Sequence, residues 1–249
     1  MKRILAIAVL TLLASVSALA QSAEKKPDAA MPTTDQILDK YVQALGGKAA
    51  IEKHTSRVTK GVMEIPTFGL SGTMETYEKA PNKSLLIITI GGFGEIKEGF
   101  DGTMAWADHP QTGLRDKTGG ELADTKLEAD FYRPLRLKAL YPKMMVKGKE
   151  KVGEREAYVI EATPAAGSTE KWYFDTQTGL LIRSDAERET PEGKMAFETH
   201  FEDYKEVDGI KAPFTLRISN PAVSIVAKLQ EVKHNVEIED AKFNKPAAK

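Results

Sequence analysis

The sequence predicts a mainly β protein with helical insertions, built on an antiparallel sheet of about eleven or twelve strands. Strand-length segments follow one another along the chain and are separated by turns that contain glycine, proline or asparagine. The pattern changes to helical spacing in two regions, near residues 33–53 and 121–140. Because short turns join consecutive strands, we expect them to pair in antiparallel fashion.

Residues 1–20 have the order of a secretory signal peptide. A basic start at residues 2–3 precedes an uncharged apolar run over residues 4–13, and the small residues of 18–20 (Ala-Leu-Ala) supply a cleavage site. The apolar run is shorter than the roughly 20 residues needed to span a bilayer, which disfavours a membrane anchor. No cysteine follows it for lipid attachment. We therefore expect export to the periplasm, with cleavage after Ala20.

The rest of the chain predicts one domain. Residues 21–32 are rich in Ala, Lys and Pro, which is typical of a flexible leader. Residues 33–243 contain no linker and no internal repeat, and their length suits a single all-β domain. Residues 244–249 are expected to form a loose tail.

Composition excludes several classes of function. The 249 residues carry a formal net charge of −1, with basic and acidic residues interleaved, so no basic stripe marks a nucleic-acid surface. The chain has no cysteine, which removes thiol nucleophiles, iron–sulfur clusters and cysteine zinc sites. Without disulfides, stability must come from packing and hydrogen bonds.

The first helix and the first strands can be placed from local signals. Thr33 and Gln36 have the spacing of a capping box, and apolar residues then recur at helical spacing up to Leu45. Gly46-Gly47 ends this helix, and residues 48–53 add a short helical turn. Five strands are expected next, at residues 58–65, 70–77, 83–90, 94–100 and 103–107.

Residues 121–140 interrupt the strands. Acidic residues lie in the first half and basic residues in the second, which suits a helix dipole. Pro134 predicts either two short helices or one bent helix. Seven strands are expected afterwards, at residues 144–152, 156–163, 169–174, 180–189, 194–205, 210–219 and 223–237.

Several short motifs together point to a known family. Residues 72–82 form a strand that ends in a basic residue and Pro-Asn, and residues 101–106 read Asp-Gly-x-x-x-Trp, with Pro110 following at a matching interval. Residues 240–243 include a closing Ala-Lys-Phe, and residues 41–47 provide a similar opening helix. This order resembles the LolA/LolB-like outer-membrane lipoprotein-sorting family, the lipoprotein carriers.

The resemblance implies an unclosed antiparallel half-barrel of about eleven strands covered by α-helices. It also implies an apolar cavity between sheet and helices that holds acyl chains. One position departs from the family. Ala80 stands where the carriers have the Arg that helps to close their helical lid, and Lys79 points to the opposite face of its strand.

The concave face of such a sheet is the expected binding site, because an open apolar face must be covered or filled. If the helices cover it loosely, an acyl chain fits, and each buried methylene contributes about 0.8 kcal/mol. If they fill it completely, the same residues are ordinary core. The candidate lining residues are Met63, Ile65, Leu70, Met74, Leu86, Ile88, Phe93, Phe100, Trp106, Leu127, Phe131 and Leu135.

No pattern of catalytic or metal-binding residues stands out. The four histidines have no metal-ligand spacing, and we expect all of them to be solvated surface residues: His54, His109, His200 and His234. We also expect the carboxylates of residues 124–130 to form a solvated face. The sequence therefore predicts a protein that is not an enzyme and has no metal, cofactor or catalytic residue.

The leading interpretation is an exported carrier or chaperone that binds lipid or the acyl chains of a lipoprotein. Its expected partners are those acyl chains and components of envelope lipoprotein sorting, not nucleic acid. One alternative is a non-enzymatic scaffold or interaction module of the cell envelope with a filled core, which would bind partners through an open strand edge. A third is a secreted hydrolase, although no nucleophile–base pair is visible.

Overall fold

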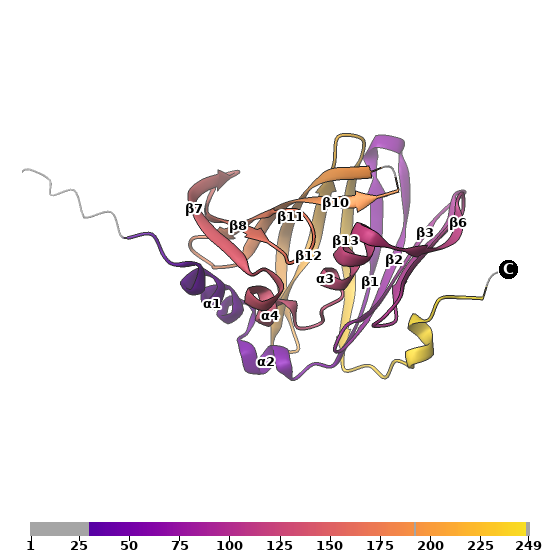
Figure 1. Ribbon diagram of the computed structural model, residues 1–249, viewed down its shortest axis with the longest axis horizontal. Helices are drawn as coiled ribbons and strands as arrows, with labels where there is room; N and C mark the ends of the chain where they lie inside the picture. The colour runs from indigo at the N-terminus through magenta and orange to yellow at the C-terminus, as the bar shows by residue number, and fades with distance from the viewer. Residues whose placement is uncertain (1–29, 192, 248–249) are drawn as a thin grey trace, which may run out of the picture. The chain divides into compact units, whose positions relative to one another are not determined.

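Thirteen strands form one antiparallel sheet that does not close into a barrel (Figure 1). The computed structural model describes residues 30–191 and 193–247, so the expected signal peptide and nearly all of the leader lie outside the described residues. The first meander contains β1 (Ser56–Ile65), β2 (Leu70–Lys79), β3 (Lys83–Ile90), β4 (Gly94–Phe100), β5 (Ala105–His109) and β6 (Gly113–Lys117). The second contains β7 (Lys143–Val152), β8 (Arg155–Thr163), β9 (Glu170–Asp175), β10 (Leu181–Thr190), β11 (Gly193–Val207), β12 (Ile210–Ser219) and β13 (Ser224–His234).

One long-range pairing joins the two meanders. The first strand, β1, pairs with the last, β13, so that β6 and β7 become the two free edges of the sheet. At the bulge in this seam, a Cβ on Gly61 would lie 2.4 Å from the Lys228 carbonyl oxygen, so only glycine fits there. This topology confirms the predicted unclosed antiparallel sheet.

The helices form as the local signals predict. Helix α1 (Thr34–Leu45) begins at Thr33 with both hydrogen bonds of the capping box to Gln36, and α2 (Lys48–Glu52) follows. The region near residues 121–140 folds into two helices, α3 (Gly119–Glu128) and α4 (Arg133–Leu140). Pro134 lies in the first turn of α4, where a missing N–H is tolerated, so it starts this helix instead of kinking it.

The chain passes from β6 to β7 through α3 and α4, which lie in front of the central strands in Figure 1. We call the face of the sheet under these helices the inner face. On it, apolar side chains of α1, α4, β8 and β9 form a buried cluster: Ile37, Leu38, Leu137, Tyr141, Ile160, Ala162, Trp172 and Phe174. The helices therefore cover the part of the sheet built by the second meander.

A second cluster lies on the opposite, outer face of the first meander. Trp106, Val58 and Leu85 pack there against Phe243, which is 0% exposed and lies in a short 3₁₀ helix (Asp240–Phe243). The Trp106 indole N–H donates to the Phe243 carbonyl at 3.0 Å. The C-terminal segment therefore covers the outer face of the first meander, whereas α1 and α4 cover the inner face of the second meander.

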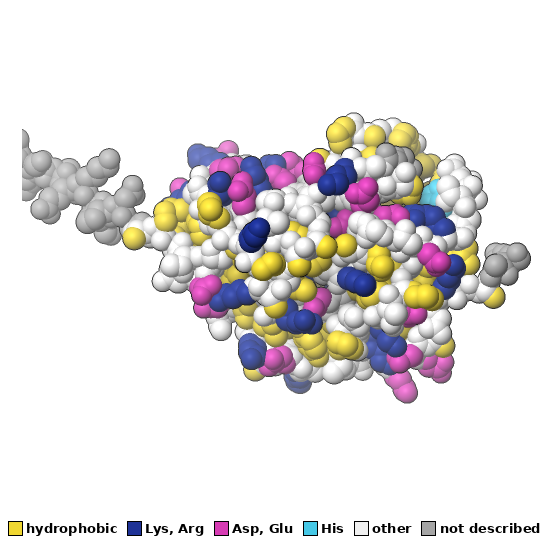
Figure 2. Space-filling model, in the orientation of Figure 1, with side chains coloured by type: hydrophobic (Ala, Val, Ile, Leu, Met, Phe, Trp, Pro, Cys, Tyr) yellow, Lys and Arg dark blue, Asp and Glu magenta, His cyan; other side chains and the backbone are white. Residues whose placement is uncertain are grey.

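Strand β6 was not among the predicted strands, because residues 113–117 lack apolar alternation. As an edge strand it has a neighbour on one side only, and charged residues such as Arg115 suit such an edge. Figure 2 shows basic and acidic side chains interspersed over the visible face, in line with the near-zero net charge.

We expect the contact between Gly99 and Trp106 to be intolerant of a methyl group. A Cβ on Gly99 would lie 2.3 Å from the Trp106 ring, so Gly99→Ala should lower the free energy of unfolding by about 1–3 kcal/mol through overpacking. Gly91→Ala is the control, since nothing lies within 4 Å of its added Cβ. Urea unfolding followed by tryptophan fluorescence measures both, and equal stabilities would contradict the packing.

The C-terminal segment also predicts a pH effect. Hydrogen bonds from Lys79 and then Lys83 lower the pKa of Asp240 to about 2. Because this pKa is depressed in the folded state, its contribution to stability is present above the unfolded value near 3.9 and is lost as the pH falls towards 2. A carbon-13 NMR titration should show this low midpoint, and a return towards 3.9 in the Lys79→Gln/Lys83→Gln double variant. An unchanged midpoint in that variant would exclude the two lysines as the cause.

Candidate functional site

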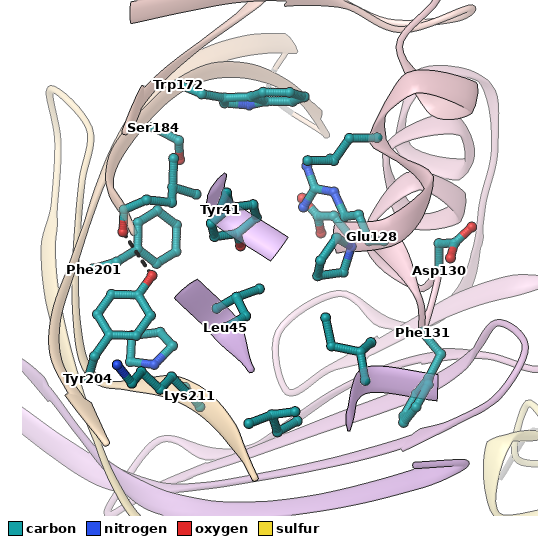
Figure 3. Close-up of a pocket in the computed structure, with 18 of the residues that line it drawn as sticks. Tyr41, Leu45, Glu128, Asp130, Phe131, Trp172, Ser184, Phe201, Tyr204 and Lys211 are labelled. Carbon is teal, nitrogen blue, oxygen red and sulfur yellow. Dashed lines mark hydrogen bonds between the residues drawn. The ribbon is translucent and has the colours of Figure 1, made fainter. Parts of the chain in front are cut away.

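A cavity of about 400 Å³ lies between the inner face of the sheet and the helices (Figure 3). Helices α1 and α2 and the α3–α4 region form its helical side, and strands β9–β13 together with the start of β1 form its sheet side. Figure 3 shows Phe201 and Tyr204 on one side of the cavity and Phe131 on the other. Its apolar and aromatic lining residues are Tyr41, Leu45, Ile51, Phe131, Pro134, Leu137, Trp172, Phe174, Leu181, Phe201, Tyr204, Ile210, Ala212 and Pro213.

Aromatic rings form much of this wall. Tyr41 of α1 packs against Phe174 of β9 with ring centroids 5.1 Å apart, and burial raises the pKa of Tyr41 to about 12. The Tyr204 hydroxyl donates to the Leu181 carbonyl at 2.8 Å, so this polar group is satisfied within the wall. Such a wall is suited to an apolar ligand with few polar groups.

One end of the cavity contains a buried carboxylate with a full set of partners. The Glu170 side chain is 2% exposed and accepts hydrogen bonds from Tyr141 at 3.0 Å and from the Trp172 indole at 2.7 Å. Arg188 lies 3.0 Å from Glu170, and Arg133 lies 3.7 Å away. A buried charge is tolerated only when it is paired and hydrogen-bonded, which these four groups achieve.

A second ion pair lies where the α3–α4 region meets β1 and β2. Arg57 of β1 donates two hydrogen bonds to Glu78 of β2, at 2.6 and 2.7 Å, and its guanidinium lies 5.9 Å from the centroid of the Phe131 ring. The two partners are directly opposite each other in the strand register. The Glu78 carboxylate raises the pKa of Arg57, so the guanidinium stays charged.

Two of the four histidines are part of this site, which corrects the expectation that all four are solvated. His54 is 2% exposed as a residue, and the His234 side chain is also 2% exposed. Their rings stack with centroids 4.3 Å apart, and both line the cavity. Sequence reasoning missed them because their burial results from the β1–β13 pairing, which places His234 opposite Arg57.

The expected solvated face over residues 124–130 also needs correction at one position. Asp130 is buried and pairs with Arg136 at 2.7 Å, while Glu128 stays more exposed and pairs with Arg188 at 2.9 Å. Burial raises the pKa of Asp124. Asp124 and Glu128 connect α3 to β10, whereas Asp130 contacts α4, and two of these carboxylates, Glu128 and Asp130, line the cavity.

A wider groove of about 780 Å³ lies next to the cavity, between α3, β5, β6 and the strands β10–β12. Four residues line both spaces: Glu128, Ser184, Arg188 and Thr199. The Arg188–Glu128 ion pair therefore lies where the cavity and the groove meet.

The candidate lining residues are placed in different environments. Phe131 lines the cavity, and Leu127 and Leu135 pack in the clusters that surround it. Leu86 lines a separate space of about 220 Å³ next to Thr125 and Glu128. Strand alternation places five others with Leu86 on the inner face of the first meander: Met63, Ile65, Leu70, Met74 and Ile88.

The remaining three candidates lie elsewhere. Phe100 is buried with Ala105 and Ala129. Phe93 lies in the β3–β4 turn and packs edge-on against His109. Trp106 belongs to the outer cluster. Sequence reasoning did not select the cavity residues of α1, β9 and β11, although Trp172 and Phe174 are apolar signals in the chain.

The described ranges contain no group of three or more His, Asp or Glu side chains that could hold a metal ion. Over residues 30–191 and 193–247, no helix is both long and apolar enough to cross a membrane.

Solved structures share this arrangement of sheet and helices. A DUF1329 family protein from Desulfovibrio piger matches over 86% of this chain and 98% of its own, with a TM-score of 0.61 and 17% identity. A LolA superfamily protein from Nitrosomonas europaea matches over 86% and 99%, with a TM-score of 0.57 and 13% identity. The protein has a LolA-like fold.

A third similar structure is an outer membrane lipoprotein-sorting protein domain from Vibrio parahaemolyticus, which matches over 85% of this chain and 97% of its own at a TM-score of 0.58 and 13% identity. No protein-family model matches the chain, and no curated protein sequence matches it. At these identities the LolA-like likeness extends to the fold alone.

We expect Glu170 to be essential for stability. Glu170→Leu leaves Arg188 and Arg133 without their buried partner, so the free energy of unfolding should fall by about 3–5 kcal/mol. Glu202→Leu is the control, because its pair with Arg217 is exposed and should contribute less than about 1 kcal/mol. Chemical unfolding of both variants tests this, and a loss at Glu170 no larger than at Glu202 would contradict the role of the buried network.

Proposed function

We propose that the protein is an exported, non-enzymatic carrier or chaperone that holds an acyl chain in the cavity of its LolA-like fold. The observation that carries this proposal is the cavity of about 400 Å³, whose wall combines aromatic and aliphatic side chains with charged ones that are largely paired. The apolar part of such a wall can take up an apolar chain, and its polar groups can orient the ligand. The signal-peptide pattern of residues 1–20 supports a periplasmic location.

The size of the cavity limits the cargo. A methylene group fills roughly the 30 Å³ of a water molecule, so about a dozen such groups fit. At about 0.8 kcal/mol for each buried methylene, one chain of this length gains enough to offset the cost of association. The cavity as it stands therefore suits one acyl chain, and a cargo with several chains requires the adjoining groove as well.

The ion pair between Arg188 and Glu128 suggests how that larger cargo is admitted. Glu128 is the last residue of α3, and Arg188 lies on β10. Separation of this pair would join the cavity to the groove without disturbing the strand hydrogen bonds. The partners proposed for the protein are accordingly the acyl chains of lipids or lipoproteins and the envelope components that deliver and receive them.

The proposal predicts that lipid copurifies with the protein. Native mass spectrometry followed by organic extraction should find it, and the emptied protein should bind a dodecanoyl probe. Phe201→Glu should weaken that binding at least tenfold, because a carboxylate would then be buried in the wall, away from the Arg57 guanidinium that lies against Phe131.

Phe68→Glu is the matched control, since Phe68 is 64% exposed and does not line the cavity. It should bind the probe as the natural protein does. A purified protein that carries no lipid and rejects fatty acids, monoacylglycerols and lipopeptides would overturn the carrier function.

A further inference from the structure

The imidazole of His234 leaves one buried nitrogen without a partner. Its Nδ1 lies 3.0 Å from the Asp208 carboxylate, in the turn between β11 and β12. Its Nε2 is buried, and no group among the described residues hydrogen-bonds to it. His234 lines the cavity and its side chain is 2% exposed, so this buried nitrogen belongs to a residue of a wall that mixes apolar and charged side chains.

The surroundings decide which hydrogen-bonding role Nε2 has. An ionised carboxylate only accepts, so the Nδ1–H of His234 donates to Asp208. Burial lowers the pKa of His234, and this effect, together with the nearby His54 and Arg57, outweighs the opposing effect of the hydrogen bond to Asp208, which favours the neutral ring at pH 7. The proton of a neutral imidazole is then on Nδ1, and Nε2 carries a lone pair that accepts a hydrogen bond.

The stacked histidine does not fill this role. His54 Nε2 lies 3.1 Å from the Asp208 carbonyl oxygen, to which it donates, and His54 Nδ1 lies 3.4 Å from the Asn235 side-chain nitrogen. Both ring nitrogens of His54 are therefore engaged outside the cavity. The acceptor on His234 is left for a donor that enters the cavity.

The same cavity contains a complementary free donor. Arg133 Nη2 donates to the Tyr141 hydroxyl at 2.7 Å, whereas Arg133 Nε is buried and has no hydrogen-bond partner among the described residues. A buried donor or acceptor that stays unsatisfied costs about 1–3 kcal/mol, so a ligand that satisfies both atoms gains affinity and orientation.

We propose that the cavity binds a single-chain lipid with a neutral, hydroxyl-bearing head, of the monoacylglycerol type, whose O–H donates to His234 Nε2. Such a lipid also carries an ester carbonyl, the kind of acceptor that Arg133 Nε lacks. This inference rests on the proposed function, because it names the class of lipid that the carrier cavity selects.

Two other head groups fit less well. A fatty-acid carboxylate has no hydrogen to donate to Nε2. An ammonium head can donate, but it brings a charge into a lining whose acidic side chains (Glu78, Glu128, Asp130 and Glu170) are already matched by basic ones (Arg57, Arg133, Arg188 and Lys211). A hydroxyl group donates without bringing a charge into the cavity.

The test compares three probes of one chain length: 1-monododecanoylglycerol, the same lipid with both hydroxyls methylated, and dodecanoate. The natural protein should bind the hydroxylated lipid about tenfold more tightly than the methylated one, as expected when a buried acceptor gains or lacks its donor. In the complex, the nitrogen-15 NMR signal of His234 Nε2 should shift to the value of a hydrogen-bonded acceptor.

Two variants identify the atom. In His234→Asn, the side-chain amide can still donate to Asp208, but no atom replaces Nε2. Both lipids should then bind within twofold of each other. Asp208→Asn offers an amide N–H to Nδ1, which moves the ring proton to Nε2 and should likewise abolish the preference for the hydroxylated lipid. His200→Asn is the control, because His200 neighbours Phe201 on β11 and so lies on the outer face.

The outcomes separate the two proposals. A tenfold preference that is lost in His234→Asn and kept in His200→Asn supports the inference. If the natural protein binds the two monoacylglycerols equally, or prefers dodecanoate, the inference is wrong and the carrier function stands. If no probe binds, the carrier function fails and the inference fails with it.

Discussion

The pairing of β1 with β13 is the contact on which the rest of the structure depends. It joins two meanders that would otherwise be separate sheets with four free edges. It also places Arg57 opposite His234, although most of the chain separates these two residues. The two polar side chains therefore meet beside the cavity only when β1 and β13 are paired. Such a long-range pairing must overcome the entropy of closing a loop that contains nearly the whole domain.

The sheet remains open because its two edges are connected by helices instead of by hydrogen bonds. Helices α3 and α4 link β6 to β7 and lie over the inner face. Glu170 ties this cover to the sheet, since it bonds to Tyr141 next to α4 and to Arg188 on β10. The helical cover is held by this polar network and by the apolar cluster of α1 and α4, and the cavity lies between the cover and the sheet.

Different segments of the chain bury the two faces of the sheet. The outer face of the first meander is closed by the C-terminal segment through Phe243, and the inner face of the second meander is closed by α1 and α4. The inner face of the first meander, where Met74 and Ile88 lie, is only partly buried and borders the open groove. The partly buried apolar surface therefore extends from the cavity towards the first meander.

The local elements follow from short-range patterns in the chain. The capping box at Thr33, the division of the helical insertion near Pro134 and most of the strands depend on neighbouring residues, so pattern and propensity are sufficient to predict them. The Asp101–Trp106 motif indicated the fold through resemblance, although Trp106 packs on the face opposite the cavity. The edge strand β6 was not predicted, because a strand with a neighbour on one side only needs no alternation of apolar residues.

The face of each strand that is covered, and the segment that covers it, depend on long-range packing. Alternation gives every strand two faces, but the choice of the lining residues depends on where α1, α4 and the C-terminal segment dock. For the same reason His54 and His234 have the sequence context of surface residues and are nevertheless buried. Their burial depends on contacts between residues far apart in the chain, which a local pattern does not contain.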